Sequence, residues 1–231
     1  MARSSNKIAV YLEAGEKRTF AGALDWPGWC RSGRDEASAL QALFDYGPRY
    51  ARVLRISRLG FQTPTNVSAF VVIERLKGNA TTDFGAPDSA PSSDSRPINS
   101  AELQHFERLL KACWRSFDAN VRKATGKALR TGPRGGGRHL EGIIQHVLGS
   151  DAGYSSQLGW KLQQDAGADL RSQLKRARKG ILEGLRSATR GEIPARGPRG
   201  GIRWHPRYFV RRAAWHTLDH AWEIEDRVLS E

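Results

Sequence analysis

Ala214-Trp-His-Thr-Leu-Asp-His-Ala-Trp-Glu-Ile-Glu-Asp-Arg227 is the stretch that decides how the second half of the chain folds. His216 and His220 are four residues apart, so on a helix both rings project from one face, about one turn apart. His146, in Leu140-Glu-Gly-Ile-Ile-Gln-His-Val-Leu148, lies on a separate helical stretch. If the two helices pack side by side, three imidazoles can share one metal ion. Three neutral ligands with open positions are typical of a catalytic metal site.

Residues 99–231 contain four helical patterns. The first opens with Asn99 and Glu102, the spacing of a capping box. The others run from about Arg138 to near Trp160, from Leu170 to Leu185, and from Pro206 to Val228. Four amphipathic helices with modest connections predict an all-α antiparallel four-helix bundle, running up-down-up-down.

Two similar loops precede the histidine-bearing helices, namely Gly132-Pro-Arg-Gly-Gly-Gly-Arg138 and Gly197-Pro-Arg-Gly-Gly-Ile-Arg203. In an up-down-up-down bundle both loops lie at the same end, and the three histidines lie at similar depth below it. Arginine binds carboxylate or phosphate in a forked geometry. We therefore expect Arg134, Arg138, Arg199 and Arg203 to form an anionic-substrate gate above the metal, with Arg138 and Arg203 as the substrate-binding pair. The competing interpretation is a general nucleic-acid surface, shared with the basic run at residues 175–179.

Other residues are expected to support the site. One of three carboxylates should accept the second ring N–H of a ligand histidine and fix its tautomer, unless each is simply solvated. These candidates are Asp219, Glu223 and Asp226. Tyr154, eight residues beyond His146, is a candidate to hydrogen-bond substrate, with packing as the alternative. Glycines at 142, 149 and 153 lie on the same helix face as His146 and leave that face without large side chains. This indicates either a substrate cavity or close helix packing. No catalytic residue is identified.

Residues 1–77 have a different pattern, typical of a small α+β domain. Alternating apolar residues at 8–12 and an apolar run at 19–24 predict a hairpin. Helical spacing follows at 35–44 and from 49 to about 57, and residues 67–73 read as a strand. Small, polar and proline residues dominate 78–98, which predicts a flexible linker and places the second domain at 99–231.

Composition bounds the function. Residues 99–231 carry 24 basic and 14 acidic side chains, so they contribute +10 of the net charge of +13. Such a field attracts polyanions or small anionic substrates. The two cysteines, Cys30 and Cys113, are too few for a disulfide framework. No apolar run is long enough to span a bilayer and no secretory signal is evident, so we expect a cytoplasmic protein without membrane contact.

Two resemblances follow from these motifs. Residues 99–231, with His146 on the second helix and His216-x-x-x-His220 on the fourth, resemble the DinB-like (DinB/YfiT) superfamily. The resemblance implies that these histidines hold zinc, nickel or a similar divalent ion, and that a low-molecular-weight thiol takes part in some reactions. The run Asp25-x-Pro27-Gly28, then Gly33, then Asp35-Glu36-Ala37, resembles the N-terminal domain of the HicB-like antitoxin family.

We therefore expect a divalent-metal-dependent transferase or hydrolase that acts on a small anionic or thiol-containing substrate. The alternative is a nucleic-acid-binding or toxin-antitoxin-like regulator whose metal site is structural or inactive. Exposed sheet edges and the pair Trp26 and Trp29 also suggest a homodimer formed through the first domain.

Overall fold

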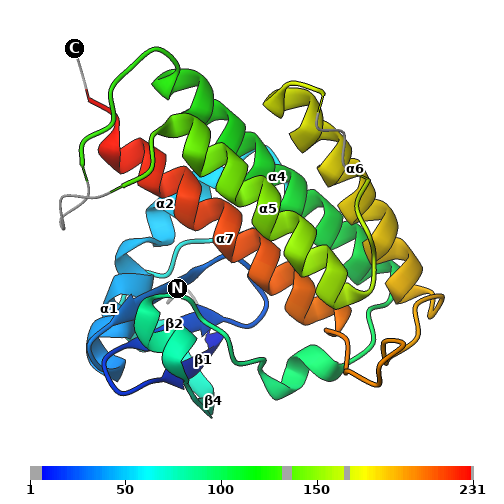
Figure 1. Ribbon diagram of the computed structural model, residues 1–231. Coiled ribbons are helices and arrows are strands. Elements are labelled where there is room, and N and C mark those ends of the chain that lie inside the picture. Colours follow the sequence, from blue (N-terminus) through cyan, green and yellow to red (C-terminus); the bar gives the residue numbers. More distant parts are fainter. Residues whose placement is uncertain (1–6, 132–136, 164–166, 230–231) are drawn as a thin grey trace. The chain divides into compact units, whose positions relative to one another are not determined.

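The computed structural model describes residues 7–131, 137–163 and 167–229 (Figure 1). The chain divides into two compact units, Met1–Arg96 and Pro97–Glu231. The first unit contains a small mixed sheet with helices, and the second is helical, as the sequence predicts at this level. Each unit is described by itself.

The first unit is built on a four-stranded sheet of order β3-β2-β1-β4. The predicted hairpin is confirmed, because β1 pairs antiparallel with β2, with Val10 opposite Ala23. On its other side β1 pairs parallel with β4, and β2 pairs antiparallel with β3. The strands and long helices of this unit are β1 (Ile8–Ala14), β2 (Thr19–Ala23), β3 (Cys30–Gly33), α1 (Glu36–Asp45), α2 (Gly47–Leu54) and β4 (Phe70–Lys77).

Local sequence explains the start of α1 and the packing beneath it. Asp35 caps α1 by accepting a hydrogen bond from the Ser38 backbone N–H at 2.8 Å. Trp29 is fully buried and donates its indole N–H to the Leu43 carbonyl at 2.8 Å. Trp29 is therefore a core residue, and the expectation that it contributes to a self-association surface is wrong.

The segment predicted as a flexible linker, residues 78–98, is for the most part a folded portion of the first unit. It contains α3 (Ala80–Phe84) and a short 3-10 helix, η2 (Ser92–Ser95), and the division between units falls after Arg96. The reason is Glu13, a fully buried carboxylate on β1 that needs donors. The segment supplies them from the Thr82 hydroxyl at 2.5 Å and the Asp88 and Ser89 backbone N–H groups at 2.8 and 3.0 Å. Composition alone does not reveal this partner.

Four long helices occupy the described part of the second unit, and they pack against one another (Figure 1). Helix α4 lies beside α7 and α6, and α5 lies beside α7 and α6. Asn99 caps α4 through the predicted capping box with Glu102. The helices are α4 (Ser100–Ala124), α5 (Leu140–Leu158), α6 (Leu170–Thr189) and α7 (Pro206–Arg227).

Polar contacts between the helices fix their directions. Glu102 pairs with Arg207 near the start of α4 and α7, and Asn120 donates to the Ala221 carbonyl further along both, so these two helices run parallel. In contrast, α6 runs antiparallel to α4. Its later residue Arg186 meets Glu107, near the start of α4, whereas its earlier residue Arg178 meets Asp118, further along α4.

Helices α5 and α7 run antiparallel, because the chain just before α5 contacts the end of α7 and the chain just before α7 contacts the end of α5. It follows that α5 and α6 run in the same direction, and the predicted up-down-up-down order is wrong. The connection between Leu158 and Leu170 makes this possible, since eleven extended residues reach about 36 Å while α5 is only about 28 Å long. Trp160 and Leu162 from this connection pack on the glycine positions of α6.

An apolar core joins the helices, and it includes Phe117, Ile143, Val147, Leu174 and Ala221. Cys113 is also fully buried, and burial raises the pKa of its thiol well above the ordinary range, so it is a core residue as the sequence indicates. Among the described helices, none has the length and apolar character needed to cross a membrane.

Candidate metal site

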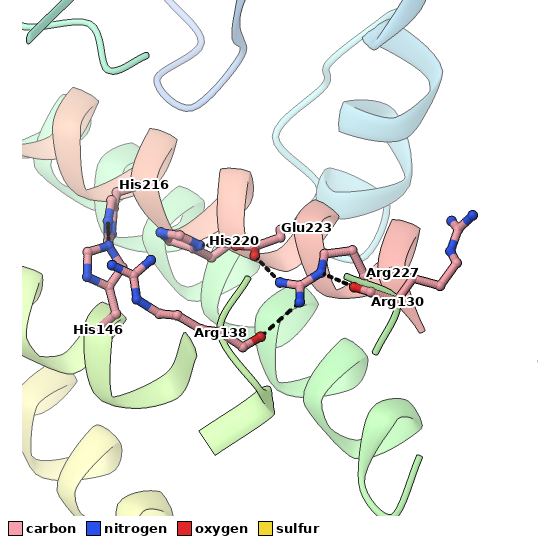
Figure 2. Close-up of polar contacts among 7 residues, drawn as sticks. All are labelled: Arg130, Arg138, His146, His216, His220, Glu223 and Arg227. Carbon is pink, nitrogen blue, oxygen red and sulfur yellow. Dashed lines mark hydrogen bonds and ion pairs between the residues drawn. The ribbon is translucent and has the colours of Figure 1, made fainter. Parts of the chain in front are cut away.

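The rings of His146, His216 and His220 converge between α5 and α7 (Figure 2). The His146 and His216 Nε2 atoms are 3.2 Å apart, and one ring nitrogen from each histidine lies within 4.8 Å of the others. The ring centroids are separated by 4.5 to 5.0 Å. The sequence prediction that these three side chains meet agrees with the structure.

They meet for a different reason from the one expected. His146 is close to the start of α5, six residues after Leu140, whereas His220 is close to the end of α7, seven residues before Arg227. Because α5 and α7 run antiparallel, the start of α5 lies beside the end of α7, and this brings the two histidines to the same level. The prediction that the loops before the two helices lie at the same end of the unit is wrong. Arg138 lies beside Arg227, and Arg203 packs on Gly159 at the opposite end of α5.

The three residues could hold a divalent metal ion. Nitrogen ligands bind zinc at about 2.0–2.1 Å, which in tetrahedral geometry places two nitrogens about 3.4 Å apart. The 3.2 Å between the His146 and His216 Nε2 atoms is close to this value. Metal ligation also requires neutral imidazoles. Burial, followed by the proximity of His220, lowers the pKa of His146, and the same causes hold the pKa of His216 well below its ordinary value.

Glu223 and Arg227 hold the third ring from behind. The Glu223 carboxylate is 2.6 Å from His220 Nδ1, which leaves Nε2 of that ring for a ligand (Figure 2). Arg227 pairs with the same carboxylate and donates to the Arg130 and Arg138 carbonyls at 2.8 and 2.9 Å. Burial opposes ionisation of Glu223, but the bonds from His220 and Arg227 outweigh it and hold the pKa of this carboxyl below its ordinary value. A carboxylate behind a ligand histidine fixes the ring and its tautomer.

Of the three carboxylates considered from the sequence, Glu223 bonds the ring of His220. The other two occupy different positions on α7. Asp219 is half-buried and Asp226 is exposed. Glu223 is one helical turn beyond His220, so their contact follows from the (i, i+3) spacing.

The predicted substrate-binding residues separate into two groups. The exposed Arg138 extends toward the histidines, and its charge contributes to the lowered pKa of both His146 and His216 (Figure 2). Tyr154 also reaches the cluster, with its ring edge-on to His216 at a centroid distance of 5.6 Å. Arg203 does not, because it is held at the other end of α5, where it donates to the Pro194 carbonyl at 3.0 Å. The other gate arginine of the first loop, Arg134, lies outside the described residues.

The cluster is least buried on the side of His146. His216 and His220 are 6% and 9% exposed, whereas His146 is only partly buried. At Gly149 and Gly153, on the same side of α5 as His146, an added Cβ would meet no described atom within 4 Å outside the local helix backbone and chain neighbours. Close helix packing therefore does not explain these two glycines. Gly142 differs, since a Cβ there would touch Arg138 and His139.

Sequence reasoning missed two residues of the site, Arg212 and Arg227. Arg212 donates to the Tyr154 hydroxyl at 3.3 Å and contributes to the lowered pKa of His216. Residues 212, 216 and 220 follow one another at intervals of four, so the shared helix face could have revealed Arg212. Arg227 acts through contacts with distant backbone, which no local pattern in the sequence predicts.

Comparison with known proteins adds no assignment. No protein-family model, no curated protein and no solved structure matches this chain.

Proposed function

We propose that residues 97–231 form a four-helix bundle of the DinB-like type and that the chain is a divalent-metal-dependent transferase or hydrolase. The observation that carries the proposal is the convergence of His146, His216 and His220, with Glu223 behind His220. Zinc or nickel is the ion that suits three imidazole nitrogens. The first unit is proposed to be a HicB-like module.

The substrate is a small molecule that carries an anionic group or a thiol. Bound to the three histidines, the ion would supply Lewis acidity, polarising a substrate oxygen or lowering the pKa of water or of a thiol. The remaining roles belong to side chains. The Arg138 guanidinium binds the anionic group of the substrate, and Tyr154, held by Arg212, borders the same space. Glu223 keeps a proton on His220 Nδ1, so that the ring presents Nε2 to the ion.

Metal binding is the first test. The full chain, stripped with a chelator, is titrated with Zn²⁺ and with Ni²⁺, and the bound metal is measured by elemental analysis after desalting. We expect one ion per chain, lost in His146→Ala, His216→Ala and His220→Ala. His139→Ala is the matched control, since His139 is exposed and precedes α5. Metal retained in all three variants would refute the site.

Turnover is the second test. The metal-loaded chain is mixed with low-molecular-weight thiols, such as cysteine or glutathione, and electrophilic acceptors, while the loss of free thiol is followed; hydrolysis of small anionic esters is followed in parallel. We expect activity that disappears in the His216→Ala variant and that falls in Arg138→Ala without loss of metal. The enzymatic proposal would be contradicted if the chain binds metal but catalyses neither thiol transfer nor ester hydrolysis, both as the wild type and as Arg138→Ala.

A further inference from the structure

A second candidate binding site lies on another face of the helical unit, in a cavity of about 690 Å³ between α4 and α6. Small-molecule sites in proteins have volumes of about 300–1,000 Å³. The cavity is separate from the three histidines: its one residue from α5 is Ile144, and residues two apart on a helix point in nearly opposite directions. Its lining residues come from the second unit alone.

The floor of the cavity is apolar. Leu170 and Leu174 supply one row of it from α6, four residues apart and so on one helix face. Val121 on α4 and Ile144 on α5 continue this surface, and both are only partly buried against the core. Partly covered aliphatic side chains favour a ligand with an apolar body.

The rim is strongly basic. Arg122, Arg171, Lys175 and Arg178 line the cavity together with a single carboxylate, Asp118, so the lining charge is four positive against one negative. Asp118 is already engaged, at 2.8 Å from Arg178. In the part of the chain that the structure describes, no ion pair engages Arg122, Arg171 or Lys175.

Arg178 is the one cation of the rim that is not exposed. Its side chain is 13% exposed, and its Nε and Nη2 atoms are buried without a hydrogen-bond partner among the described residues. Asp118 and its own burial therefore hold Arg178 in place, which leaves the three exposed cations of the rim to meet a ligand.

We propose that this cavity binds a small organic anion with an apolar body, of which a medium-chain carboxylate is the simplest member. The aliphatic side chains take the hydrocarbon portion, and the Arg122, Arg171 and Lys175 rim takes the carboxylate. A nucleic acid would use the rim but leave the apolar floor uncovered, which is why the small amphipathic anion is favoured.

The test uses the full chain and decanoate, titrated by isothermal calorimetry below the concentration at which decanoate forms micelles. We expect saturable binding of one decanoate per chain. Each methylene removed from the ligand should weaken binding about fourfold, as expected for transfer of CH₂ groups out of water. Decanamide, which keeps the chain but not the charge, should bind about tenfold more weakly or worse.

Variants locate the site. Arg122→Glu/Lys175→Glu should weaken decanoate binding by about tenfold or more. The matched control is Lys123→Glu/Lys179→Glu, which reverses two exposed lysines on the same helices outside the cavity and should leave binding unchanged. All four positions are exposed, so circular dichroism should show both variants folded. His146→Ala should bind decanoate as the wild type does.

Several results would overturn the proposal. One is no saturable binding up to about 10 mM decanoate. Another is that the control pair weakens decanoate binding as much as the Arg122/Lys175 pair does. A third is loss of decanoate binding in His146→Ala, which would place the ligand at the histidines. Displacement of decanoate by a short DNA duplex, with the Arg122/Lys175 pair required for duplex binding, would assign this face to nucleic acid instead.

Discussion

Glu223 determines which nitrogen His220 presents, because its carboxylate contacts Nδ1 at 2.6 Å. Replacing it by Gln removes the charge behind the ring and the anionic partner of Arg227. We expect Glu223→Gln to weaken metal affinity on the order of 10- to 100-fold, as is typical when such a partner is lost. Competition titration against a chromogenic chelator measures the change. Glu225→Gln, exposed and two residues away, is the control, and equal affinities for the two variants would contradict this role.

His216 predicts a pH dependence of stability in the metal-free protein. Burial is the main reason that its pKa in the folded chain lies below the ordinary value of 6.5, which applies to the unfolded chain. Between the folded-state pKa and 6.5 the unfolded state therefore binds more protons than the folded state. The contribution of His216 is complete above pH 6.5 and is lost as the pH falls. Urea unfolding with chelator present, at pH 7.5 and 5.5, should show the wild type losing stability relative to His216→Gln at the lower pH. A constant difference would argue against a buried, neutral ring.

Asp151 on α5 predicts a pH dependence of stability with the opposite sign to that of His216. Both of its carboxylate oxygens are buried without a partner among the described residues, and burial raises the pKa of this carboxyl to about 7, against a smaller opposing effect of Arg178. The folded state therefore binds the extra proton between about pH 3.8 and 7.

The stability of the wild type relative to Asp151→Asn should fall as the pH rises from 5 to 7, by at most about 1.4 kcal/mol per pH unit, and level off above 7. Chemical denaturation at intervals of half a pH unit measures this difference. A wild-type advantage that grows with pH over this range would show that Asp151 is charged in the folded chain.

The sequence predicted individual site residues unevenly. The pair His216 and His220 share a helix face whatever the rest of the fold does, so their proximity was predictable. The role of Arg203 was not, because its position depends on which end of α5 meets the start of α7. Glu223 was one of three acceptable carboxylates, and only side-chain geometry distinguishes it.

The glycines of α5 and α6 have different surroundings. Gly149 faces open space, whereas a Cβ at Gly184 would come within 2.5 Å of the Trp160 ring. We expect Gly149→Ala to stabilise the chain by about 0.5–1 kcal/mol, because alanine favours the helix, and Gly184→Ala to destabilise it.

Thermal unfolding measures both effects. If the space over Gly149 admits substrate, the more stable Gly149→Ala variant should also turn over more slowly, with its metal content unchanged. Gly149→Ala being less stable than the wild type would mean that the open space is not as described.

Elements were easier to predict than their arrangement. The β1–β2 hairpin and the Asn99 cap of α4 follow from local alternation and side-chain chemistry. The direction of α6 relative to α5 does not, because both directions satisfy the same amphipathic pattern and the connection is long enough for either. The sequence does not reveal that residues 78–96 are folded, because the carboxylate that binds them is distant in sequence. Glu13 accepts a hydrogen bond from Thr82, which is more than sixty residues away.

In the whole molecule, the candidate metal site belongs to one unit. All three histidines, Glu223 and Arg227 lie between Pro97 and Glu231. We expect residues 97–231, expressed alone, to bind one Zn²⁺ with the affinity of the full chain, and residues 1–96 to bind none. Elemental analysis and calorimetry on the two fragments check this. Binding that needs both fragments would show that the first unit contributes to the site.

The antiparallel pairing of α5 and α7 also has a consequence for biosynthesis. The ribosome makes His146 seventy residues before His216, so a nascent chain that has extruded α4, α5 and α6 still offers only one imidazole of the three. An ion bound by the three histidines therefore could not template the early helices, and its capture would wait until α7 has emerged and docked.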